Sequence, residues 1–193
     1  MGVCVREAAD STTIDWSRDV QMNEPAAADA CWNFVIVLYA KQGVSQACLV
    51  LQDQLGVDVS FLLTALFHAA RRQEDLTAED IEKLDQFISV WRNETVLPLR
   101  ALRRRLKEDH PVVDSVAELY RQIKAAELLA ERLEIGALVQ QLERISGNPA
   151  AAPSGRATIE HVVRYFANAS KLNHRLDEAI IQSAVSVLVA AST

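Results

Sequence analysis

The chain has 193 residues, half of them hydrophobic, and its 26 acidic residues outnumber its 20 basic residues to give a net charge of -6. This length fits one domain that buries a hydrophobic core of its own, so the chain needs no disulfide scaffold. The negative charge argues against a protein whose whole surface binds nucleic acid or anionic lipid.

The N-terminal residues and the cysteines predict a cytoplasmic protein. Residues 1–24 carry several charges where a secretory signal needs an apolar run, so we expect a flexible extension there. Cys4, Cys31 and Cys48 are an odd number of thiols, which is typical of a reducing compartment. No stretch is long and apolar enough for a transmembrane helix, so we predict no membrane span.

Three helices are predicted next, over residues 25–43, 44–55 and 59–72. The first is apolar on nearly all sides over residues 31–39, so we expect it to be the central buried helix. The second is expected to end at Gly56 in a left-handed cap. Asp58 is expected to cap the N-terminus of the third.

The middle of the chain predicts two further helices before a proline-containing turn. Thr77 and Asp80 form a capping pattern that begins the fourth helix, with an apolar face at Ile81, Leu84, Ile88 and Trp91. Pro98 interrupts the pattern that follows. The helix therefore either kinks there or ends near Asn93, and we favour a kinked or broken pair.

The remaining sequence predicts the longest helix and a C-terminal helical pair. The long helix lies near residues 112–145 and carries an apolar stripe at Val116, Leu119, Ile123, Ala126, Ala130 and Leu133. Small residues and prolines predict a linker over 146–157, and Thr158 is expected to cap the first helix of the pair. We therefore predict an all-α helical bundle of about seven or eight helices. Its parts are an extension at 1–24, a core domain at 25–145, a linker at 146–157 and a helical pair at 158–193.

The densest charge feature is the segment 92–107, which holds six basic residues and one acid. At helical spacing, one face, here called the basic face, carries Arg100, Arg103, Arg104 and Lys107, while Leu99, Leu102 and Leu106 lie on another. Such a face suits phosphate groups, nucleic acid or an acidic partner, because guanidinium groups match these oxygens. Alternatively, it pairs within the molecule with the acid-rich segment 108–145, packed antiparallel beside it.

A second set of polar residues predicts a notch between the first two helices. Its members are Tyr39, Gln52, Asp53 and Asp58. The functional hypothesis is a site for a partner or small ligand, with Tyr39 as an amphipathic wall. The alternative is local hydrogen bonding, with Asp58 as an N-cap and Asp53 paired to a bundle arginine such as Arg92 or Arg100.

The notch residues lie within a pattern that resembles a known family signature. Residues 38–59 read LYAxxGVxxACLxLQDxxGxDV, and a second block follows at Trp91, Arg92, Val96, Pro98, Leu99, Arg100, Arg103 and Lys107. Both blocks resemble a bacterial family of small all-helical proteins described only as a domain of unknown function. The resemblance covers about residues 31–145 and implies a small, soluble, helical protein, but it names no activity.

The sequence contains no recognisable catalytic motif. His68, His110, His161 and His174 form no pair at metal-binding spacing, and there is neither a nucleophile elbow nor a phosphate-binding glycine loop. We therefore predict no catalytic residues, no metal and no cofactor, and we favour a protein that is not an enzyme.

These observations together favour a partner-binding adaptor or regulatory protein. Its protein partner would contact the basic face, the notch or the C-terminal pair, and the pair is also a possible homo-oligomer contact. One alternative is an enzyme that holds a small ligand or cofactor between core helices. Another is a nucleic-acid-binding protein that uses residues 99–107, although we expect polyanion binding less than protein binding.

Overall fold

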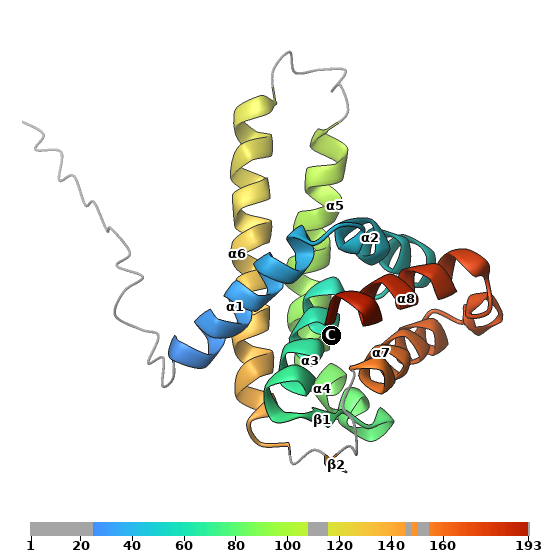
Figure 1. Cartoon of the computed structure of the whole chain (residues 1–193). Helices are drawn as coiled ribbons and strands as arrows, with labels where there is room; N and C mark the ends of the chain where they lie inside the picture. Colours follow the sequence, from blue (N-terminus) through green and yellow to red (C-terminus); the bar gives the residue numbers. More distant parts are fainter. Residues whose placement is uncertain (1–24, 108–115, 146–147, 150–154, 193) are drawn as a thin grey trace, which may run out of the picture.

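The computed structural model describes residues 25–107, 116–145, 148–149 and 155–192 (Figure 1). The predicted extension at 1–24, the start of the predicted long helix and most of the predicted linker lie outside these residues. The described elements are α1 (Pro25–Ala40), α2 (Val44–Leu55), α3 (Val59–Arg72), β1 (Glu74–Asp75), α4 (Ala78–Trp91), a π-helical turn η1 (Arg92–Val96), α5 (Leu97–Leu106), α6 (Ala117–Leu142), β2 (Asn148–Pro149), α7 (Arg156–Ala169), a 3-10 turn η2 (Asn173–Arg175) and α8 (Ala179–Ser192). The protein is a helical bundle, as predicted.

Local signals set the ends of α2 and α3. Gly56 has a φ of 73°, and its N–H donates to Gln52 O, so the left-handed cap predicted after α2 is confirmed. Asp58 Oδ1 accepts a hydrogen bond from Phe61 N at 3.2 Å, which confirms the predicted N-cap of α3. The tight turn between these caps brings α3 back against α2.

The prediction that the first helix is central and buried is wrong. Helix α1 buries Ala27, Cys31 and Leu38, but half or more of Ile36 and Val37 is exposed. It lies across the outside of α6, and the centre of the bundle is α3 (Figure 1). An apolar composition on all sides does not reveal how many neighbouring helices cover a helix, and α1 is covered on one side only.

The segment around Pro98 is continuous helix and not a broken pair. The predicted capping box of Thr77 and Asp80 begins α4, and helical backbone then continues through η1 into α5. Pro98 lies in the first turn of α5, directly after the π-helical turn. Proline has no N–H to donate to the preceding turn, and an irregular turn such as η1 is where the regular hydrogen bonds of a helix are interrupted.

Helix α6 has 26 residues and is the longest of the described helices, as predicted. It runs antiparallel to α5, and the two form a hairpin that extends beyond the other helices (Figure 1). The predicted apolar stripe is only partly its buried face: Ala130 is buried, but Leu119 and Leu133 are about half exposed, and Glu127 and Glu134 are buried instead. Glu127 turns inward because Arg100 and Arg103 of α5 lie opposite it.

The two C-terminal helices complete the same core. Helix α7 begins at Arg156, two residues before the expected cap Thr158. The Thr158 hydroxyl instead donates to Asp75 Oδ1 at 2.9 Å and accepts from Leu76 N at 3.0 Å, which holds the segment after α3 against α7. Helix α8 lies against α2, and its buried Leu188 belongs to the core cluster that contains Leu51.

Several helices are apolar enough to raise the question of a membrane span. Among the described residues, no single helix combines the length and the hydropathy needed to cross a membrane. Residues 27–40 and 44–55 pass together by length and composition, as a pair bent by 97°.

Candidate functional site

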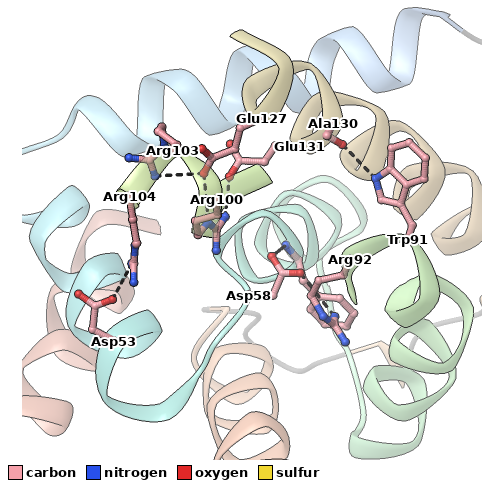
Figure 2. Close-up of polar contacts among 11 residues, drawn as sticks. Asp53, Asp58, Trp91, Arg92, Arg100, Arg103, Arg104, Glu127, Ala130 and Glu131 are labelled. Carbon is pink, nitrogen blue, oxygen red and sulfur yellow. Dashed lines mark hydrogen bonds and ion pairs between the residues drawn. The ribbon is translucent and has the colours of Figure 1, made fainter. Parts of the chain in front are cut away.

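The inner part of the basic face pairs with α6. Arg100 donates to Glu131 Oε1 at 2.6 Å and to Glu127 Oε1 at 3.2 Å. Arg103 donates to both carboxylate oxygens of Glu127. Figure 2 shows both arginines pointing from α5 toward these acids. These two arginines of the basic face therefore form ion pairs within the molecule. Such internal pairing is the alternative to polyanion binding that the sequence analysis gave.

The ion pairs of Arg100 and Arg103 with Glu127 and Glu131 form a contact between α5 and α6 that is here called the seam. Burial and ion pairing shift the pKa values of its two acids in opposite directions. Burial opposes ionisation of Glu127, but hydrogen bonds and charges from Arg103 and Arg100 outweigh it, so its pKa is lowered. Burial dominates at Glu131, and its pKa is raised although Arg100 pairs with it. Glu127 is therefore the firmly charged centre of the seam, because it is the acid shared by both arginines.

The outer part of the basic face reaches α2. Arg104 Nη2 lies 3.0 Å from Asp53 Oδ1, and about half of each side chain is exposed to solvent. The sequence analysis offered pairing of Asp53 with a bundle arginine as the alternative to a functional notch, and the structure shows such a pair, with Arg104 in place of the suggested Arg92 or Arg100. This contact joins the basic face to the notch, two sites that the sequence treats separately (Figure 2).

Tyr39 approaches the same seam from the end of α1. Burial raises the pKa of its hydroxyl, with further contributions from Cys48 and Glu131, while Arg100 opposes the rise. The charges of Glu131 and Arg100 thus influence the Tyr39 hydroxyl from α6 and α5. The side chain is still 38% exposed, so part of its ring faces solvent. Gln52 is half-buried on α2.

Asp58 does not belong to this seam. It is 4% exposed, and its second carboxylate oxygen lies 3.4 Å from Arg92 Nη1. Arg92 also donates to Asp85 at 2.5 Å, and Asp85 accepts from the Tyr165 hydroxyl at 2.7 Å. This buried network links α3, α4, η1 and α7, so we interpret Asp58 as a structural residue and remove it from the notch.

The same network contains an acid that the sequence analysis missed. Glu134 is fully buried, and burial together with Asp58 raises its pKa to about 9, so it is protonated at neutral pH. The spacing of Glu127, Glu131 and Glu134 places them on one helical face, a signal that the apolar stripe obscured. The π-helical turn that positions Arg92 has no comparable sequence signal.

The buried nucleophiles are not prepared for catalysis. Burial raises the pKa of Cys48 and of Cys31 to about 12, so both remain neutral thiols. Burial lowers the pKa of His68, so its imidazole is neutral. Among the described residues, no group of three or more His, Cys, Asp or Glu side chains is arranged to hold a metal ion.

Comparison with known proteins places these residues in one family. No curated protein and no solved structure matches the chain. A family model with the description "Protein of unknown function (DUF2390)" matches residues 30–138. The match covers more than half of the chain, from α1 to the last turns of α6, and includes the whole seam. The chain therefore belongs to this family, and the matched segment holds the seam together with Asp58, Asp85 and Arg92 of the buried network.

Proposed function

We propose that the protein is an adaptor or regulatory protein that binds an acidic, amphipathic segment of another protein. The binding surface, here called the notch face, consists of Ile36, Tyr39, Leu49, Leu128, Asp53, Arg104, Lys107 and Lys124. The observation that carries the proposal is the convergence of the basic face and the notch on one seam, through the Arg104–Asp53 contact.

Exposed apolar side chains border the seam on the α1 side. Arg132 of α6 lies over the ring of Trp32, 5.6 Å from its centroid. One turn further along each helix are Ile36 and Leu128, which are 50% and 52% exposed. Helix α1 crosses α6 in this region (Figure 1). Neighbouring exposed apolar side chains of this size favour a protein contact, because water solvates them poorly.

Unpaired cations border the seam on the hairpin side. Lys107 is one turn beyond Arg103 on α5, and Lys124 is one turn before Glu127 on α6. Neither lysine forms an ion pair among the described residues, whereas Arg100 and Arg103 are neutralised by buried acids. The exposed charge of the notch face is therefore positive, which suits carboxylates on a partner.

The acids within the seam favour a protein partner over nucleic acid. Glu127 and Glu131 engage Arg100 and Arg103 within the molecule, so only Arg104 and Lys107 of the basic face remain for the regularly spaced phosphates of a nucleic acid. A partner segment that combines carboxylates with apolar residues can instead contact the lysines and the apolar border together.

Site-specific photo-crosslinking tests this proposal. A photoreactive amino acid at Leu128 should capture a discrete partner in cells of the source organism, and the same group at the exposed Asn168 on α7 should not. The captured segment is then purified and its affinity measured directly. Lys107→Glu with Lys124→Glu should weaken it about tenfold or more, with unchanged helicity, because neither lysine has an internal ion pair. Equal capture at Asn168, or affinity unaffected by the two substitutions, would contradict the proposal.

A further inference from the structure

The outer side of α6 carries a second exposed apolar stripe, separate from the notch face. Its residues Leu119, Leu129 and Leu133 are 47%, 58% and 49% exposed, and Ala126 lies among them half-buried. Leu119, Ala126 and Leu133 recur every seven residues, and Leu129 follows Ala126 by three. This is the spacing of a helix that packs along another helix.

No described element covers this outer stripe. The seam side of α6 faces α5 through Glu127 and Glu131, and α1 packs on Ile135 and Val139. In Figure 1, α6 forms one edge of the bundle, and α1 crosses it while α5 lies on its other side. Helices α3 and α4 also pack on α6, so the stripe lies on its remaining side, where the leucines are about half exposed.

The end of α4 widens the apolar surface. Trp91 Nε1 donates to Ala130 O at 3.2 Å, which fixes the indole against α6 beside the stripe (Figure 2). Phe87 and Val90, on the same side of α4 at helical spacing, are 48% and 62% exposed. The surface is therefore broader than a single line of leucines.

The geometry points to a second copy of this chain as the occupant, with the two α6 helices packed antiparallel across a two-fold axis near Ala126. In that arrangement Leu119 lies beside Leu133 of the second copy. Glu118, one residue before Leu119, lies beside Arg132 of the second copy, which precedes Leu133. The arrangement thus brings apolar residues onto apolar residues and opposite charges onto each other, as a two-fold interface requires. Within its own chain Glu118 also pairs with Arg121, and Arg132 with Asp29. The small Ala126 side chain lets the helices approach closely at the axis.

The dimer is independent of the notch face, which lies on another side of α6. It also differs from a contact through the C-terminal helices, because α8 already buries Ile181, Val185 and Leu188 in its own bundle. Two copies joined through α6 would present two notch faces and bind a partner that carries two acidic segments more tightly than one.

Disulfide trapping tests the register of the two helices. The background is the full chain with Cys4→Ser, since Cys31 and Cys48 are buried. Ala126→Cys should form a covalent dimer under mild oxidation. Leu119→Cys and Leu133→Cys should cross-link when mixed but not separately, because antiparallel helices bring the two positions together.

The outcome of trapping decides between the arrangements. Efficient cross-linking of Leu119→Cys with itself would indicate parallel helices and overturn the proposal. Cross-linking of the control Lys124→Cys at the same rate as Ala126→Cys would indicate random collision and would also overturn it. Lys124 is a fair control because it is exposed on the same helix but on the notch face.

Sedimentation gives the second, independent test. The full chain should be a dimer, and Leu129→Glu with Leu133→Glu should be a monomer with unchanged helicity. Glu118→Arg alone should weaken the dimer about fivefold, and Arg132→Glu added to it should restore affinity. Asp29→Asn controls for the contact that Arg132 makes within its own chain. A monomeric full chain would overturn the dimer. It would not bear on the notch face, because that proposal is tested separately, by the partner affinity of the Lys107 and Lys124 variants.

Discussion

The guanidinium of Arg92 lies 3.4 Å from the carboxylate of Asp58, where the π-helical turn η1 meets the first turn of α3. Asp58 also caps α3, and Arg92 also pairs with Asp85, so one buried contact connects three helical segments. Both side chains are almost completely buried. The pair therefore holds the base of the α5–α6 hairpin in the bundle, and the seam above it depends on that position.

Arg92→Met should destabilise the fold strongly. The substitution retains an unbranched apolar stem but leaves Asp58 and Asp85 buried without a cation, which costs about 3–5 kcal/mol in comparable cases. Urea unfolding measures the loss. Arg105→Met is the matched control, because Arg105 is exposed and forms no ion pair among the described residues, and it should change stability by less than about 0.5 kcal/mol. A loss as small at Arg92 would show that the network is dispensable.

Glu134→Gln should remove a pH dependence of stability. The pKa of Glu134 is raised from 4.5 to about 9 in the folded chain, so the folded state holds this proton more tightly than the unfolded state. The stabilisation is therefore complete below about pH 4.5 and is lost as the pH rises toward about 9. Glutamine imitates the protonated acid, so the variant should gain stability over the natural chain as the pH rises from 5 to 9. A difference that does not change with pH would contradict a raised pKa.

Asp53→Asn should leave stability nearly unchanged. The Arg104–Asp53 pair is about half exposed, and such pairs contribute about 0–1 kcal/mol. Glu127→Gln is the informative contrast, since Glu127 is buried and accepts from two arginines, and its loss should cost several times more. The melting temperatures of both variants decide the matter. Similar falls would mean that the outer contact is as structural as the inner one.

Thr158→Val should cost about 1–3 kcal/mol. Valine has the shape of threonine but cannot accept the hydrogen bond from Leu76 N or donate to Asp75, so a buried backbone N–H is left unpaired. Thr158→Ser retains the hydroxyl and is expected to lose less stability than valine, through its missing methyl group. Chemical denaturation of the two variants compares them directly. A serine variant less stable than the valine variant would indicate that packing, and not the hydroxyl, holds this segment.

Elements whose signals lie within a few residues were predictable from the sequence. The cap at Gly56, the N-cap at Asp58 and the capping box at Thr77 each involve groups no more than four residues apart. Their geometry is local, because each satisfies the free N–H or C=O groups at a helix end. The bounds of α2 and α3 follow from them.

Which side of a helix is buried was not predictable from such local signals. The apolar residues of α6 form a stripe, and hydrophobicity alone favours burying Leu119 and Leu133. The structure exposes both and buries Glu127, because Arg100 and Arg103 of α5 lie opposite and offset the cost of burying its charge. Glu134 is buried too, but without an ion pair among the described residues, and its raised pKa keeps it protonated. That choice depends on a neighbouring helix.

The sequence by itself therefore determined the helical class, the end of α2 and the starts of α3 and α4. Only the tertiary structure decided that Arg104 pairs with Asp53 and that Asp58 pairs with Arg92 outside the notch. It also decided that α3 is the centre of the bundle. The physical reason is the separation along the chain of the residues that each interaction joins. Capping and helical periodicity act between residues close in the chain, whereas burial and ion pairing depend on which distant segments share the same space.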